Sequence, residues 1–181
     1  MIVAPVDEPG AWIRDVRSRY DPIAAAVPPH VTLVYPFEDD IALDALGEHL
    51  TDALAAFTAF EVTLEGVSGA EGTYLRYDIK RGNDTLIAMH DRLYTGPLAR
   101  HLDLRASFHP HLTIGRIADA ARWRAALDEL AANAPRATVA VGRVLSYRRY
   151  ADGTRHMDHA IALRPAPGAL TGAGHARGAK R

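Results

Sequence analysis

The sequence predicts an α+β fold of two similar lobes related by a pseudo-twofold axis, each an antiparallel sheet with helices on its outer face. Two observations predict it. A five-residue pattern, Pro-His-apolar-Thr-apolar, occurs at residues 29–33 and again at 110–114. Helix and strand patterns also follow in the same order around both copies. This period is too long for a solenoid repeat, and it fits two lobes that face each other across a central cleft.

The first half of the chain alternates apolar and polar residues where strands are expected, and spaces apolar residues by three or four where helices are expected. The acidic pair Asp39 and Asp40 is expected to cap the second helix. The expected elements are a strand at 2–6, a helix from about 7 to 20, the first motif strand at 30–35, a helix with apolar positions from 43 to 57, and strands at 60–65 and 75–79.

The second half repeats this order, with the second motif histidine 81 positions after the first (111 − 30). The expected elements are a helix from 84 to 98 that Gly96 and Pro97 kink or split, the second motif strand from 111, a helix capped by Asp119, one strand from 137 to about 147, a turn at 152–153 and a strand at 157–163. The expected bilobal domain, with its lobes interleaved in sequence, covers 1–165. Residues 166–181 are rich in Gly and Ala, show no buried pattern, and are expected to be a disordered tail.

Composition narrows the classes of function. The chain has 181 residues, a formal net charge of −1 and no cysteine, which excludes a disulfide framework, a cysteine zinc site and a cysteine nucleophile. Proteins that grip long nucleic acids are usually basic, so an RNA substrate is expected to be held at a terminus. The chain shows neither the roughly 18 apolar residues of a membrane helix nor the pattern of a signal peptide. We expect a cytoplasmic monomer with no membrane partner.

The motif residues suit acid–base chemistry on a phosphodiester. A strand alternates its faces, so each copy presents its histidine and threonine on one side and two apolar residues on the other. Two imidazoles, one neutral and one protonated, can take a proton from water and give one to the leaving oxygen near neutral pH. The threonine hydroxyls can donate to the non-bridging oxygens, and no metal is needed in principle. These four residues are His30, Thr32, His111 and Thr113.

The motif segments carry a family resemblance. Residues 29–35, Pro-His-Val-Thr-Leu-Val-Tyr, and residues 110–116, Pro-His-Leu-Thr-Ile-Gly-Arg, resemble the two signatures of the 2H phosphoesterase superfamily, nearest to its 2′-5′ RNA ligase (RNA 2′,3′-cyclic phosphodiesterase) branch. The resemblance implies a bilobal fold with a cleft, and action on 2′,3′-cyclic phosphate or 2′-5′ linkages without metal, ATP or another cofactor. It implies that His30 and His111 are catalytic and that Thr32 and Thr113 bind phosphate.

Three further residues are candidates for substrate binding. By the resemblance, Tyr35 stands where the family often has an aromatic residue that stacks on a base, and Arg116 where it often has an arginine near the phosphate. Strict alternation from His111 would point Arg116 away from the cleft, so that role requires a bend near Gly115. Arg148 flanks the last hairpin and can meet a phosphate or base, but a solvated hairpin tip explains it equally well.

Several alternatives stay open. A non-catalytic protein with the same cleft would bind RNA ends or nucleotides without turnover. A metal-dependent hydrolase would use His109 and His111, although two ligands do not make a closed site. The sequence also leaves open which histidine is the acid, whether the chain hydrolyses or ligates, and whether the substrate is an RNA end, a small cyclic nucleotide or ADP-ribose cyclic phosphate.

Overall fold

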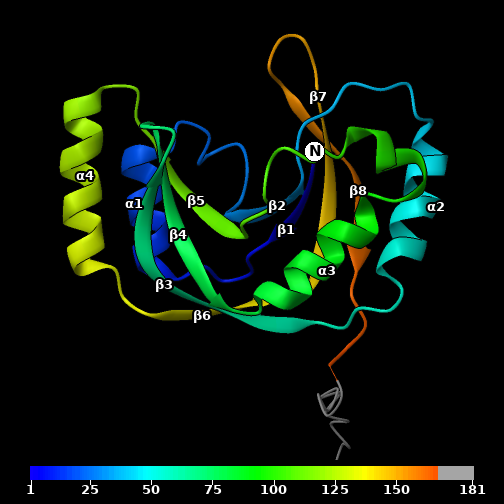
Figure 1. The fold of residues 1–181 in the computed structure, drawn as a ribbon, viewed down its shortest axis with the longest axis horizontal. Coiled ribbons are helices and arrows are strands. Elements are labelled where there is room, and N and C mark those ends of the chain that lie inside the picture. The colour runs from blue at the N-terminus through cyan, green and yellow to red at the C-terminus, as the bar shows by residue number, and fades with distance from the viewer. Residues whose placement is uncertain (167–181) are drawn as a thin grey trace, which may run out of the picture.

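Within residues 1–166, eight strands form one curled antiparallel sheet, on which the helices pack (Figure 1). The structure is a computed structural model and describes residues 1–166. The predicted α+β class is confirmed. All but the first residue of the predicted disordered tail, 166–181, lies outside the described residues. None of the helices in residues 1–166 is long and apolar enough to cross a membrane.

The strands match the predicted ones in position, with one exception given below. Most form where apolar and polar residues alternate, whereas β1 is a short run of buried apolar residues. The strands are β1 (Ile2–Pro5), β2 (His30–Val34), β3 (Phe60–Ala70), β4 (Tyr74–Arg81), β5 (His111–Arg116), β6 (Ala137–Val141), β7 (Arg143–Arg149) and β8 (Arg155–Ala162).

The helices also fall where apolar residues recur at helical spacing. Asp119 caps the last one as predicted, because its Oδ1 accepts the backbone N–H of Arg122 at 2.7 Å. The segment expected to kink or split at Gly96 and Pro97 is split: one helix ends at Leu93, and a short 3-10 helix begins at Gly96. The helices are α1 (Gly10–Tyr20), α2 (Leu43–Leu54), α3 (Asn83–Leu93), the 3-10 helix η1 (Gly96–His101) and α4 (Ala120–Asn133).

The strand order places both motifs at the centre of the sheet. The order is β6-β3-β4-β5-β2-β1-β7-β8, so the two motif strands, β5 and β2, are neighbours. Strand β1 flanks β2 as β4 flanks β5. Helix α1, which connects β1 to β2, packs on β5, and helix α3, which connects β4 to β5, packs on β2. Each half of the sheet is therefore covered by a helix from the other half, as a pseudo-twofold arrangement requires.

The hydrophobic core lies between the sheet and its helices. Val31 and Leu33 of β2, and Leu112 and Ile114 of β5, are fully buried in it. Helix residues complete the core from the other side, among them Ile13, Val16, Leu50, Leu86, Met89 and Leu130. The histidine and threonine of each motif point to the opposite face, which we call the motif face of the sheet.

The predicted single strand from 137 to about 147 is wrong, because the chain leaves one sheet position for another at Gly142. Strand β6 pairs with β3 at one end of the strand order, whereas β7 pairs with β1 and β8. The Gly142 carbonyl instead accepts the N–H of Leu163 at 2.9 Å. Apolar residues recur on both sides of Gly142 as they would in one continuous strand. The sequence pattern therefore could not reveal that the chain changes its sheet partners at this residue.

The predicted capping of the second helix by Asp39 and Asp40 is also wrong. Helix α2 begins at Leu43 with no side-chain cap. The Asp39 carboxylate instead accepts hydrogen bonds from Arg100 and pairs with His101. The cap position is Ala42, so Asp39 and Asp40 lie too early in the chain to cap α2.

Candidate active site

The two motifs meet side by side on β2 and β5. In each strand the histidine and threonine are half-buried, whereas the apolar residues between and beyond them are buried. Val31 pairs with Leu112 in antiparallel register. Continuing this register by one residue in each direction sets His30 level with Thr113, and Thr32 level with His111. Opposed side chains on one face of an antiparallel pair have Cβ atoms about 5 Å apart, so each imidazole has the other motif's hydroxyl beside it.

Both motif histidines are held by the same hydrogen bond. The Nδ1 atom of His30 lies 2.8 Å from the carbonyl oxygen of Pro28, and that of His111 lies 2.7 Å from the carbonyl oxygen of His109. A carbonyl can only accept, so Nδ1 must carry the hydrogen in both rings. The neutral ring therefore leaves Nε2 unprotonated. In both motifs Nε2 is the atom able to take up or release a proton.

Burial lowers the pKa of both histidines below the ordinary value of 6.5 because it disfavours the charged imidazolium. Nearby positive charges lower the pKa further, from Arg17 and Arg155 at His30 and from Arg76 at His111. The hydrogen bonds from Nδ1 oppose these effects, and so do the negative charges of Asp21 at His30 and of Asp78 at His111. Both rings are consequently neutral in most molecules at neutral pH.

The surroundings of the two histidines differ in polarity. On the motif face, β4 places Arg76 level with Thr113 and Asp78 level with His111. On the other side, β1 places the apolar residues Val3 and Pro5 level with Thr32 and His30. The strand flanking β5 is therefore charged on the motif face, which we call the charged wall, and the strand flanking β2 is apolar there, which we call the apolar wall; the charges that act on His30 come from Arg17, Asp21 and Arg155, outside β1.

Sequence reasoning missed Arg76 and Asp78 as site residues. Their signal was present, because both occupy the polar positions of the strand that alternates with Leu75, Tyr77 and Ile79. An alternating strand is normally polar on its solvent face, so alternation alone did not mark them. Only the pairing of β4 with β5 shows that this polar face adjoins the second motif.

Arg116 reaches the motif face through a bulge in β5. Residues Thr113 and Gly115 pair with consecutive residues of β4, Arg76 and Leu75, which leaves one extra residue between them. A bulge of this kind reverses the alternation. Arg116 then pairs with Tyr74, its guanidinium 5.5 Å from the ring centroid. The bend expected near Gly115 is therefore present, and the role of Arg116 in substrate binding stays a prediction.

Tyr35 lies just beyond the end of β2 and is 45% exposed. It lines a pocket of about 280 Å³ together with His90 and Phe108, and the lining includes none of the four motif histidines and threonines. The stacked rings of His90 and Phe108 have centroids 3.9 Å apart. Phe108 is part of the segment leading into the second motif, so this aromatic pocket lies at the motif end of β5. The structure therefore does not bring Tyr35 into contact with the motif histidines, and its role in base stacking stays a prediction.

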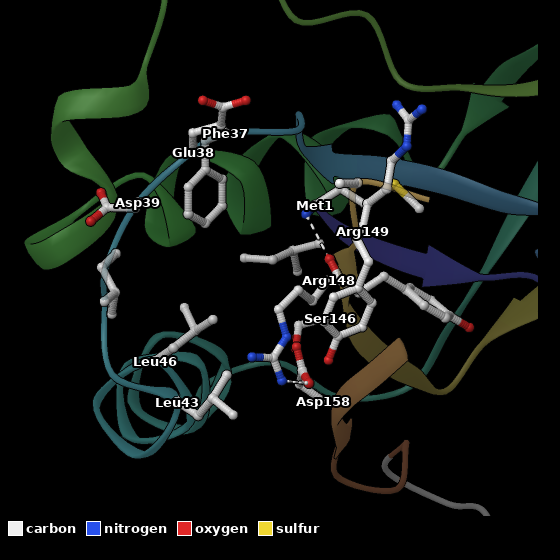
Figure 2. Close-up of a pocket in the computed structure, with 15 residues that line it drawn as sticks. Met1, Phe37, Glu38, Asp39, Leu43, Leu46, Ser146, Arg148, Arg149 and Asp158 are labelled. Carbon is white, nitrogen blue, oxygen red and sulfur yellow. Dashed lines mark hydrogen bonds and ion pairs between the residues drawn. The ribbon is translucent and has the colours of Figure 1, made fainter. Parts of the chain in front are cut away.

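Arg148 lies in a separate pocket of about 650 Å³, whose lining includes no residue of either motif. Figure 2 shows its guanidinium paired with Asp158, at 2.8 Å, across from Leu43 and Leu46 of α2. Strand β7 is separated from β2 by β1. The structure therefore does not bring Arg148 together with the motif residues.

No group of three or more His, Asp or Glu side chains that could hold a metal ion occurs in residues 1–166. The imidazole of His109 is exposed, and its Nδ1 lies 3.2 Å from the Ser107 carbonyl oxygen. His109 thus contributes its carbonyl to the orientation of His111.

Comparison with known sequences gives a consistent picture. The sequence profile described as "2'-5' RNA ligase superfamily" matches residues 5–153. A Geobacillus kaustophilus protein named "Putative phosphoesterase" is 30% identical over 121 residues, which are 64% of this chain and 67% of that protein. A protein of the same description from Geobacillus sp. WCH70 is 35% identical over 105 residues, which are 55% of this chain and 58% of the relative.

Solved structures share the fold. Escherichia coli LigT in complex with 3′-AMP matches with a TM-score of 0.56 and 20% identity, over 90% of this chain and 95% of that one. A Thermus thermophilus protein matches with a TM-score of 0.52 and 16% identity, over 91% of this chain and 99% of that one. At these identities, the structural likeness concerns the fold alone.

Proposed function

The chain belongs to the 2′-5′ RNA ligase superfamily, and we propose that it is a phosphoesterase that opens 2′,3′-cyclic phosphodiesters at RNA or nucleotide ends. The observation that carries this proposal is the matched pair of histidines. Both have Nδ1 bound to a carbonyl and Nε2 available for proton transfer. One chain carries both motifs, so a monomer suffices, and its expected place of action is the cytoplasm.

The proposed reaction needs two proton transfers. Neutral Nε2 of one histidine takes a proton from water as the water oxygen bonds to phosphorus. Protonated Nε2 of the other histidine gives its proton to the ribose oxygen as the bond from that oxygen to phosphorus breaks. The product is a phosphomonoester, and the two rings have exchanged protonation states. Proton exchange with solvent restores them. Each positioned acid or base typically contributes roughly 10²–10⁴-fold in rate.

Thr32 and Thr113 are proposed to bind the non-bridging oxygens. Negative charge gathers on these oxygens as phosphorus becomes five-coordinate, and fixed donors stabilise it without reorganisation. The register supports this role, because each hydroxyl lies level with the opposite histidine. If a ribose 5′-hydroxyl replaces water as the nucleophile, the same groups would form a 2′-5′ linkage.

A screen of cyclic phosphodiesters tests the proposed function. The panel comprises 2′,3′-cyclic mononucleotides, an RNA with a 2′,3′-cyclic end and ADP-ribose 1″,2″-cyclic phosphate, each with and without a chelator. We expect turnover that the chelator leaves unchanged, with products identified by which ribose hydroxyl keeps the phosphate. Tight binding of an RNA end without turnover would instead identify a binding protein. Turnover abolished by the chelator and restored by metal would identify a metal-dependent hydrolase.

A further inference from the structure

Arg76 projects from β4 onto the motif face, where its side chain makes no ion pair with any other residue of 1–166. It pairs with Thr113 across the β4–β5 ladder, so its side chain leaves the sheet beside that hydroxyl. The positive charge acts on His111, because it lowers the pKa of that imidazole. Arg76 is therefore close enough to the second motif for the two groups to interact electrostatically.

The Arg76 guanidinium is incompletely satisfied. Its Nε atom is buried and has no hydrogen-bond partner, and no salt bridge to Arg76 occurs within residues 1–166. The nearest carboxylate along the strand, Asp78, is engaged by Ser68 at 2.6 Å and Lys80 at 3.2 Å. A buried donor without an acceptor is unfavourable, and such groups in native structures call for an explanation. The phosphate group of a bound substrate would supply the acceptor that Arg76 Nε lacks.

We propose that Arg76 binds a non-bridging oxygen of the substrate phosphate beside Thr113. This inference rests on the proposed phosphoesterase function and adds a cationic anchor to it. A guanidinium presents parallel N–H donors that match two oxygens of a phosphate, and it stays protonated at every pH of interest. The anchor lies on the charged side of the motif strands, because β4 supplies Arg76 beside Thr113 whereas β1 supplies only Val3 and Pro5 beside β2.

The geometry also assigns Asp78 a supporting part. Its carboxylate lies level with His111 and is held by Ser68 and Lys80 rather than by Arg76. If Asp78 paired with Arg76, that guanidinium would already be neutralised and would bind phosphate weakly. Ser68 and Lys80 thus occupy this carboxylate, and no ion pair joins it to Arg76 within residues 1–166.

Binding of inorganic phosphate tests the role of Arg76 without turnover. Wild type, Arg76→Gln, Arg76→Lys and Arg81→Gln are compared by isothermal titration and by thermal unfolding with and without phosphate. Arg81 is the matched control, an exposed arginine on the same strand. We expect phosphate to bind Arg76→Gln about tenfold or more weakly, as loss of a charge-assisted hydrogen bond predicts. The phosphate affinity of Arg76→Lys should lie between those of wild type and Arg76→Gln, because lysine keeps the positive charge but lacks the parallel N–H donors of the guanidinium. Arg81→Gln should match wild type.

Unfolding without phosphate separates anion binding from a structural role. We expect Arg76→Gln to unfold at the same or a higher temperature than wild type, because it removes a poorly partnered cation. Unchanged phosphate affinity in Arg76→Gln would overturn the inference, and so would a wild-type protein that phosphate neither binds nor stabilises. Failure of the proposed phosphoesterase function would give a different result. In that case no cyclic phosphodiester would be turned over, even if phosphate binding depended on Arg76.

Discussion

At the scale of single residues, the two motif histidines are alike in orientation and unlike in surroundings. Both donate from Nδ1 to the carbonyl two residues before them, and the intervening proline restricts the backbone between donor and acceptor. His30 adjoins the apolar wall, whereas His111 adjoins Arg76 and Asp78. The orientation is fixed by the motif itself, and the electrostatic difference comes from neighbouring strands.

The lowered pKa values of His30 and His111 predict an acidic pH optimum. The rate constant kcat/KM follows the ionisation of the free enzyme, and activity needs one neutral and one protonated ring. Because burial lowers both pKa values below 6.5, we expect a bell-shaped profile of kcat/KM with its maximum below that pH. Steady-state kinetics with a 2′,3′-cyclic nucleotide measure it. A profile still rising above neutrality would contradict the assignment of these groups.

The threonine hydroxyls predict a loss of rate without a loss of fold. Thr113→Val keeps the shape of the side chain and removes the donor, so we expect kcat to fall about 10²–10³-fold. Thr138→Val on β6 is the control, because Thr138 is exposed and belongs to neither motif. Equal kcat values for the two variants would mean that Thr113 does not stabilise the transition state.

At the scale of elements, the shape of β5 depends on Gly115. The bulge before it turns Arg116 onto the motif face. Gly115 itself is buried against helix α1, where a Cβ atom would lie 2.8 Å from Tyr20 Cβ, 3.1 Å from Leu75 Cδ1 and 3.4 Å from the Tyr20 carbonyl oxygen. Glycine is therefore required here by close packing of α1 on the second motif strand.

Gly115→Ala is expected to destabilise the fold by about 1–3 kcal/mol, as overpacking of a filled core does. Gly142→Ala is the control, because the nearest atom to its Cβ, Asp7 Oδ2, lies 3.8 Å away, and we expect it to change stability by no more than about 0.5 kcal/mol. Urea unfolding measures both. A Gly115→Ala protein as stable as wild type would show that α1 can move away from β5 at little cost.

Elements were predictable where local pattern determines them. The motif strands and the helix capped by Asp119 follow from alternation, spacing and one capping side chain. The break at Gly142 did not follow, because β6 and β7 differ in their sheet partners and not in their local pattern. For the same reason Asp39 was wrongly predicted as a cap, since its actual partners, Arg100 and His101, are about 60 residues away in sequence.

At the scale of the whole molecule, the site depends on interleaving of the two halves. Helix α1 supports β5 and helix α3 supports β2, so neither motif strand is held by its own half alone. The imidazole of His90 in α3 donates from Nδ1 to the Leu33 carbonyl of β2 at 2.8 Å, although that carbonyl is 57 residues away in sequence. The motif residues were predictable from the repeat. Arg76 was not, because its place beside Thr113 depends on sheet order.

The same two histidines predict acid sensitivity of the fold. Their pKa values are lowered in the folded protein, so the unfolded chain binds more protons below about pH 6.5, and stability falls as pH falls. Paired carboxylates such as Asp158 contribute only below their ordinary value of 3.8. We expect His30→Gln and His111→Gln to lose less unfolding free energy than wild type between about pH 7 and 5. Equal losses in urea unfolding would contradict the lowered pKa values.

The central claim is that the two motif histidines act together as acid and base. Its most direct measurement is turnover of a 2′,3′-cyclic nucleotide by His30→Ala, His111→Ala and the control His109→Ala, whose exposed ring is outside the proposed pair. We expect each motif variant to lose roughly 10²–10⁴-fold in kcat with unchanged thermal unfolding near neutral pH, and the control to keep most of its activity. Folded His30→Ala and His111→Ala proteins with wild-type turnover would contradict the account.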